Sequence, residues 1–313
     1  MIGTKFYWLM GGVLGLLALA SAIGGVLQLK VRGEPGRRVV ENLNSRIRAW
    51  WVMAAVFAVA FAAGKVATLV LFGLISFFAL REFITLTPTR RGDHLPLFLS
   101  FFVLIPVQYL LIGDGWYGLF AVFIPVYAFL VLPAVAVLSA DVDRFLERTA
   151  KIQWGVMITV FCVSHAAALL LLDIPGYAGQ NALLIFYLVL IAQLSDVLQY
   201  VFGKLFGRTK VAPVVSPSKT VEGLVGGGLS AAAIGAAMYW ITPFTWLQSL
   251  GLSAVIVVMG FLGGLALSAV KRSLGVKDWG TMIEGHGGML DRVDSLSFAA
   301  PIFFHLTRYY FTG

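Results

Sequence analysis

The sequence predicts an all-α, polytopic integral membrane protein with about ten transmembrane helices, nine being the alternative, and with its N-terminus outside. Of its 313 residues, 59% are hydrophobic and 12% are charged, whereas soluble domains carry about 25% charged residues. Apolar stretches recur along the chain, and many approach the roughly 20 residues that a helix needs to cross a bilayer. A helix satisfies its own backbone hydrogen bonds in lipid, and the alternating segments of a membrane β-barrel are not found in the sequence.

The candidate spans follow one another with short connections, and two of them are weak. They lie at residues 6–29, 50–64, 66–86, 95–112, 116–138, 152–172, 182–202, 221–242, 245–269 and 295–311. The second and third are short and only Gly64-Lys65 separates them, so one bent helix is the alternative. The first span begins like a signal peptide, but its apolar run continues to Leu29 and six basic residues follow. We therefore expect an uncleaved first helix.

The distribution of basic residues favours ten spans over nine. With ten spans, the inside loops hold 20 of the 23 Lys and Arg residues, and only Lys5, Lys65 and Arg308 lie outside. Cytoplasmic loops carry such an excess, whereas nine spans would separate the first basic loop from all the others. The net charge of +8 is then explained by loops that face anionic membrane lipids, so we expect no nucleic-acid partner.

Asp196 is the first candidate functional residue. It lies within the apolar run LVLIAQLSDVLQYVFG, near the inside end of the seventh span. A carboxylate is costly there, so it is expected to face a polar cavity or a cation. The alternative is that Asp196 lies within one turn of the membrane surface and simply reaches water.

The loop from Gly203 to Gly223 is the second candidate site. Its sequence, GKLFGRTKVAPVVSPSKTVEG, combines basic and hydroxyl side chains with Gly and Pro. Backbone amides freed by such turns, together with hydroxyl and ammonium groups, suit phosphate oxygens. The loop lacks GxxxxGK[ST], so it is not a P-loop. A basic loop that only sets the topology and contacts lipid headgroups is the alternative.

The third candidate site, KRSLGVKDWGTMIEGHGGMLDRVDS, covers residues 271–295 and carries eight charged side chains. Asp291 and Asp294 are three residues apart, so both carboxylates face the same way on a helix. A hard cation would relieve their repulsion, and Mg²⁺ commonly takes one or two carboxylates plus substrate phosphate oxygens. Arg292 could shield the pair instead.

Residues upstream of this pair add positive charge and a turn. Lys271, Arg272 and Lys277 would favour an anionic substrate, and His286-Gly287-Gly288 is typical of a tight turn into the following helix. Together these features favour Mg²⁺-assisted phosphate chemistry.

Two ordered motifs carry a resemblance to a known family. The first fits D-x-x-x-Y-x-x-G-K…S-P-x-K-T-x-E-G-x-x-G-G from Asp196 to Gly227, and the second fits S-x-x-K-R-x(4)-K-D…H-G-G-x-x-D-R-x-D from Ser268 to Asp294. Both resemble signatures of the CDP-diacylglycerol synthases, or phosphatidate cytidylyltransferases. The detailed likeness covers about 120 C-terminal residues, and the first half resembles the family only in its hydrophobic spans.

The resemblance implies a reaction in which CTP and phosphatidate give CDP-diacylglycerol and pyrophosphate, a step of phospholipid biosynthesis. It also implies Mg²⁺, with a second cation as an option, and a homodimer among membrane lipids. The lipid acceptor would be phosphatidate or a related lipid phosphate. The expected location is a bacterial inner (plasma) membrane, an endomembrane being the alternative, with the active site on the cytoplasmic side.

Together with the charge pattern, the resemblance predicts roles for twelve residues, all of them in the last of three regions. The regions are N-terminal spans with a basic loop (1–94), middle spans (95–181) and the C-terminal catalytic region (182–313). Catalytic roles fall to Asp196, Lys271, Asp291 and Asp294, metal binding to Asp291 and Asp294, and substrate binding to Lys204, Ser216, Lys219, Thr220, Arg272, Lys277, His286 and Arg292.

Gly264 is a departure from the family pattern. Family members usually carry an acid four residues before the signature Ser268, where this chain has glycine. Water, Asp196 or Asp278 could replace the missing ligand, and Gly260 with Gly264 also forms a GxxxG packing motif. A catalytically weakened or silent relative that binds lipid phosphate is therefore the second hypothesis. A transporter is the third, although no inverted repeat is evident.

Overall fold

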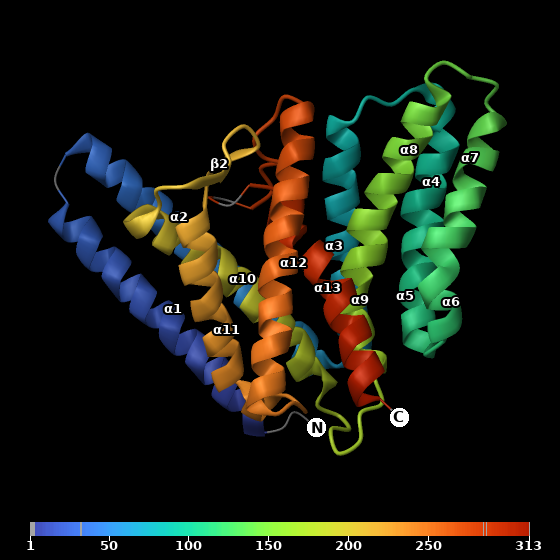
Figure 1. Ribbon diagram of the computed structural model, residues 1–313. Coiled ribbons are helices and arrows are strands. Elements are labelled where there is room, and N and C mark those ends of the chain that lie inside the picture. The colour runs from blue at the N-terminus through green and yellow to red at the C-terminus, as the bar shows by residue number, and fades with distance from the viewer. Residues whose placement is uncertain (1–3, 32, 284, 286, 313) are drawn as a thin grey trace.

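The computed structural model describes residues 4–31, 33–283, 285 and 287–312. Its helices run alternately up and down in one bundle, and Figure 1 places both termini at the same end. A two-stranded antiparallel hairpin, β1 (Lys210–Ala212) with β2 (Ser216–Thr220), lies at the opposite end.

The helical elements group into ten segments in chain order. They are α1 (Thr4–Lys30); α2 (Glu34–Ala63); α3 (Lys65–Leu86); η1 (Arg91–Asp93), α4 (His94–Leu99), η2 (Ser100–Leu104) and α5 (Ile105–Asp114); α6 (Tyr117–Val122), η3 (Phe123–Ala128) and α7 (Phe129–Val137); α8 (Phe145–Val156), η4 (Met157–Cys162), α9 (Val163–Ala168) and η5 (Leu169–Leu171); α10 (Asn181–Phe206); η6 (Gly223–Gly227) and α11 (Gly228–Ala237), followed by the short turn η7 (Tyr239–Ile241); α12 (Trp246–Ser273); and α13 (Leu290–Phe311).

The prediction of an all-α polytopic membrane protein is confirmed. Among the described residues, eight helices are long and apolar enough to cross a membrane, and the segment Gly223–Ala237 is a shorter apolar helix. The tenth segment, α13, is not one of the eight, and its first two turns carry Asp291, Arg292 and Asp294. Each predicted span therefore corresponds to a helical segment.

The second and third spans are separate helices, and the second is much longer than predicted. The chain turns at Gly64, whose φ of 94° is a conformation that favours glycine. However, α2 begins at Glu34, so most of the predicted basic loop is helix. The prediction was too short because it followed apolar residues alone, and the polar half of an amphipathic helix continues beyond the apolar run.

The five basic connections lie at one end of the bundle. In Figure 1 the links after α1, α3, α7, α10 and α12 are all at the end opposite the two termini. The alternating directions of the helices thus bring the three candidate polar segments to the same end.

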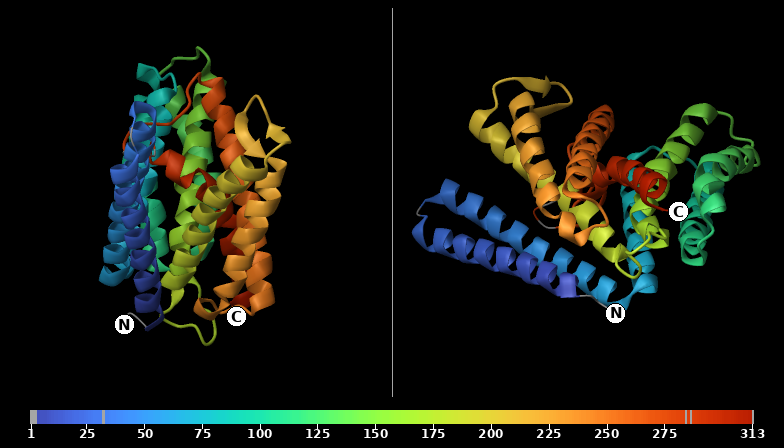
Figure 2. Two further views of the ribbon diagram at one scale, coloured as in Figure 1. Left: turned by 90° about the vertical axis from the view of Figure 1, so that its left-hand side faces the viewer. Right: turned by 60° about the horizontal axis from the view of Figure 1, so that its bottom comes forward.

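The C-terminal helices form the framework of this end. Helix α13 packs against α12, α9 and α10, and a Cβ added to Gly263 would lie 2.7 Å from the Asp294 carbonyl oxygen. The absence of a side chain at Gly263 therefore lets α12 approach α13 closely. By contrast, α1 and α2 form an arm that extends away from these helices in the right-hand view of Figure 2.

Candidate active site

Asp291 stabilises the segment that links α12 to α13. One of its carboxylate oxygens accepts a hydrogen bond from Lys271 Nζ at 2.7 Å. The other accepts from the backbone amides of Trp279 at 2.8 Å and Gly288 at 2.9 Å. Both charged side chains are buried, so the ion pair is shielded from water and removing one partner would leave a costly uncompensated charge.

Glu82 supports the same link from another helix. Its two carboxylate oxygens accept hydrogen bonds from the backbone amides of Met289 and Leu290, each at 2.8 Å. The first amides of a helix have no partner within it and favour negative charge, so Glu82 in α3 holds the start of α13. The sequence reasoning missed Glu82, although an acid in the apolar stretch FFALREFITL is the same signal that identified Asp196.

Asp196 and Asp294 come together through a shared serine. The Ser295 hydroxyl donates to the Asp196 carboxylate and lies 3.2 Å from Asp294 Oδ1, which also accepts from the Ser295 amide at 2.7 Å. Asp196 precedes the end of α10 by ten residues, a depth of about 15 Å at the rise of an α-helix. Two half-buried carboxylates from α10 and α13 therefore meet well away from the end of α10.

Lys219 reaches this pair of acids from β2. Its Nζ atom lies 4.6 Å from the centroid of the Phe261 ring, and it would be 2.8 Å from a Cβ added to Gly264. The ammonium acts electrostatically on both Asp196 and Asp294. We call Asp196, Lys219, Asp294 and Ser295 the deep cluster, and Glu82, Lys271 and Asp291 the link cluster.

Further contacts join α10 and the hairpin region to the second sequence motif. Arg272 Nε donates to the Val215 carbonyl oxygen at 3.4 Å, and Gln193 Nε2 donates to the Arg292 carbonyl oxygen at 3.0 Å. The residues in each contact are far apart in the sequence, so tertiary packing alone makes these motifs one site.

The Gly203–Gly223 loop, which contains the β1–β2 hairpin, is held by its own side chains. The Thr220 hydroxyl accepts from the Gly223 amide at 3.0 Å, and Glu222 accepts from the amides of Arg208 and Thr209 at 3.0 and 3.1 Å. Hydrogen bonds from its own amide, Arg208 and Thr209 lower the pKa of the Glu222 carboxyl to about 2. The loop therefore has a defined shape from which Lys219 extends.

The predicted residues divide into those inside the two clusters and those outside them. Asp196, Lys219, Lys271, Asp291 and Asp294 lie inside. The remaining predicted residues lie elsewhere: Ser216 and Thr220 are buried in the hairpin, Lys204, Arg272 and Lys277 are exposed, Arg292 is half-buried, and His286 is outside the described residues.

The deep cluster has a donor set that suits a hard cation. Within the part of the chain that the structure describes, no group of three or more His, Cys, Asp or Glu side chains could hold a metal ion. Two carboxylates are nevertheless enough for Mg²⁺ when substrate phosphates complete its shell. Asp196 and Asp294 fit this requirement, whereas both oxygens of Asp291 are engaged by donors. A metal-binding role for Asp291 stays a prediction.

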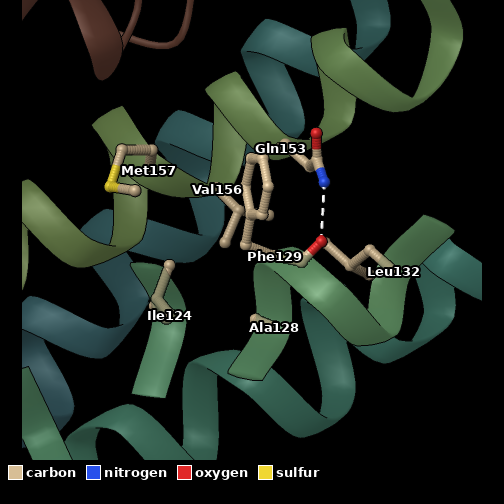
Figure 3. A pocket seen from close by; sticks show the side chains of 7 residues that line it. All are labelled: Ile124, Ala128, Phe129, Leu132, Gln153, Val156 and Met157. Atoms are coloured by element: carbon tan, nitrogen blue, oxygen red, sulfur yellow. Dashed lines mark hydrogen bonds between the residues drawn. The ribbon is translucent and has the colours of Figure 1, made fainter. Parts of the chain in front are cut away.

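Two cavities lie away from these clusters. One, shown in Figure 3, holds about 10 Å³ between η3, α7 and α8, where Gln153 Nε2 donates to the Phe129 carbonyl oxygen at 2.7 Å. It is too small for a substrate. The other holds about 390 Å³ and is lined by Lys5 and Lys65 near the N-terminal end of the bundle.

Comparisons with known proteins match the sequence of this chain to one family. A model described as "Cytidylyltransferase family" matches residues 44–310. The Escherichia coli (strain K12) protein YnbB, described as uncharacterized, is 42% identical over 298 residues, covering 94% of this chain and 95% of YnbB.

Several relatives carry the name phosphatidate cytidylyltransferase, among them those of two Staphylococcus species. That of Staphylococcus aureus (strain COL) is 42% identical over 121 residues, covering 38% of this chain and 46% of the relative. That of Staphylococcus haemolyticus (strain JCSC1435) is 36% identical over 158 residues, covering 49% of this chain and 60% of the relative. The match spans about half the length of these named relatives.

Proposed function

Because this chain belongs to the cytidylyltransferase family, we propose that it is an Mg²⁺-dependent phosphatidate cytidylyltransferase, which makes CDP-diacylglycerol and pyrophosphate from CTP and phosphatidate. The observation that carries the proposal is the deep cluster. There Asp196 and Lys219 of one motif meet Asp294 of the other, at the end of the bundle where most basic residues lie. The partial likeness to two phosphatidate cytidylyltransferases supports the acceptor.

The proposed reaction is a displacement at phosphorus. A phosphate oxygen of phosphatidate attacks the α-phosphorus of CTP, the bond from that phosphorus to the bridging oxygen of the β-phosphate breaks, and pyrophosphate leaves. Positioning and charge neutralisation do most of the work in such a transfer. When bound, Mg²⁺ would be held by Asp294 and Asp196 and would offset negative charge on the phosphates.

The chain's own residues prepare the site for these anions. Lys219 brings its ammonium from the loop, and Asp291 holds the Lys271 ammonium beside the start of α13. These two cations are in place before substrate binds, and they attract a triphosphate and a lipid phosphate. Glu82 holds the start of α13 and thereby fixes the positions of Asp291 and Asp294.

The sidedness of the protein follows from its basic connections. We propose that the end with the hairpin faces the cytoplasm of a bacterium and that the chain lies in the inner membrane. The support is the excess of Lys and Arg at this end, together with the bacterial relatives. Cytoplasmic CTP would then enter directly, and phosphatidate would arrive from the adjacent leaflet.

The direct test is release of pyrophosphate by the purified full-length protein in detergent. Incubation with CTP, Mg²⁺ and phosphatidate should release pyrophosphate and form CDP-diacylglycerol, and omission of any one component should stop it. Other nucleotides and other lipid phosphates are tested in parallel to define the acceptor. No release beside a working phosphatidate cytidylyltransferase would refute the proposal.

A second candidate function is favoured by Gly264. The position at which the family pattern has an acid is filled by glycine, and the Lys219 ammonium lies against it. A weakened relative that binds lipid phosphate would have this composition. The G264D variant separates the two functions: a large gain in pyrophosphate release indicates a weakened site, whereas high activity in the unchanged protein rules the second candidate out.

A further inference from the structure

Lys219 has an unusual environment for a lysine. Its ammonium faces the Phe261 ring at 4.6 Å from the centroid, a geometry that stabilises a cation. It also acts electrostatically on both acids of the deep cluster. Among the described residues, however, no carboxylate forms an ion pair with it within 4.0 Å. The ammonium is thus held near the acids by charge and by the aromatic ring, without a direct bond to either carboxylate.

Gly264 provides the space for this ammonium. A Cβ at position 264 would stand 2.8 Å from Lys219 Nζ and 3.7 Å from Cε. The neighbouring Gly263 faces α13 instead, where a Cβ would meet the Asp294 carbonyl oxygen and the Phe298 ring. The two adjacent glycines therefore have different roles: Gly263 allows the two helices to pack closely, and Gly264 allows the ammonium to lie against α12.

The acids of the deep cluster need a positive charge even before any substrate arrives. Two half-buried carboxylates that share one hydroxyl repel one another, and even partial burial makes uncompensated charge costly. Lys219 supplies part of that charge from within the chain, together with Lys271, which acts on Asp294, and Arg292, which acts on both acids. A cation that enters the cluster from solution must therefore compete with an ammonium that is already there.

We infer that Lys219, placed over Gly264, is a resident counter-cation that weakens the binding of free Mg²⁺ and so favours entry of the metal together with its nucleotide. The identity of the nucleotide as CTP rests on the proposed function, whereas the competition between Lys219 and Mg²⁺ does not. A triphosphate offers Lys219 a new anionic partner, so the ammonium can leave the acids as Mg²⁺ and CTP arrive. Gly264 acts as a positioning residue through Lys219.

The test uses Mg²⁺ alone, without CTP or lipid. The purified full-length protein in detergent is titrated with Mg²⁺, and the rise in its thermal unfolding temperature gives the half-saturating concentration, because a ligand that binds the folded state stabilises it. K219M should lower that concentration roughly tenfold, since it removes a nearby positive charge. G264A should lower it less, because the ammonium is displaced but retained.

Three controls make the outcome specific. G251A changes a glycine of the same helix that has no atom near the added Cβ, and it should match the unchanged protein. K219R keeps the positive charge and should also stay close to the unchanged protein. Adding D294N to K219M should abolish the gain, because it removes one of the two acids.

The result that overturns the inference is a half-saturating Mg²⁺ concentration for K219M that stays within about twofold of the unchanged protein. A gain that survives D294N would also overturn it, because Mg²⁺ would then bind elsewhere. If G264A does not fold, K219M and K219R still decide, since they change only a side chain at the hairpin. A protein that releases no pyrophosphate but shows the Mg²⁺ effect would refute the proposed function and leave this inference standing.

Discussion

Asp291 and Asp294 lie less than one turn apart on α13, but their carboxylates have different partners. The Asp291 carboxylate accepts a hydrogen bond from Lys271 and two more from backbone amides. Among the described residues, the Asp294 carboxylate accepts only from Ser295. The link cluster is thus fully paired, and its charges maintain the shape of the chain. The deep cluster retains unused acceptor capacity and a loosely held ammonium. The difference indicates that identical residue types on one helix face can divide into a structural pair and a ligand-binding pair.

The largest expected effect comes from neutralising the deep cluster. D294N should reduce CTP-dependent pyrophosphate release by roughly 10² to 10³-fold, because a charge that neutralises the transferring phosphate is lost. The unfolding temperature should hardly change, and the far-end control D173N, at an exposed position, should retain full activity. Unchanged turnover in D294N would remove Asp294 from the catalytic residues.

The second-largest expected effect is at Asp291, and it is a loss of folding stability and not primarily a loss of catalytic rate. D291N leaves Lys271 buried without its partner, at a cost of about 3–5 kcal/mol in the free energy of unfolding. Thermal or denaturant unfolding in detergent measures this loss, and the double variant K271M/D291N should recover part of it. If D291N unfolds like the unchanged protein yet is as inactive as D294N, the two clusters are not distinct and Asp291 belongs with the reacting groups.

A smaller loss of stability is expected at Glu82. E82Q keeps the size of the side chain but removes the negative charge from the start of α13, which should cost about 1–2 kcal/mol. E41Q is a matched control, because Glu41 is exposed on α2. Equal unfolding temperatures for E82Q and E41Q would contradict the role of Glu82 as the helix cap.

The smallest effect is a pH dependence in the Gly203–Gly223 loop, which contains the β1–β2 hairpin. The Glu222 carboxyl has a pKa of about 2 in the folded protein, below its ordinary value of 4.5. Its stabilisation is therefore complete above pH 4.5 and is lost as the pH falls from 4.5 towards 2. The difference in unfolding temperature between the unchanged protein and E222Q should shrink over that range. A difference that stays constant from pH 6 to pH 3 would show that the charge of Glu222 does not hold the loop.

The order of the helices and the position of the polar segments could be predicted from the sequence. Apolar runs of membrane length and the alternation of basic loops depend only on local composition, so the up-and-down arrangement followed directly. Asp196 was also found locally, because a carboxylate within an apolar run is costly. The true start of α2 at Glu34 was not found, since its polar half resembles a loop when apolarity is the only criterion.

What the sequence determined by itself is a polytopic helical membrane protein with two family motifs and a cluster of acids and cations near one end. Only the tertiary structure decided that Asp294 joins Asp196 while Asp291 joins Lys271, that Glu82 caps α13, and that Lys219 lies against Gly264. The physical reason is the range of the interactions. Helix periodicity acts within a few residues, whereas these contacts join side chains from separate helices, whose approach depends on how the whole bundle packs.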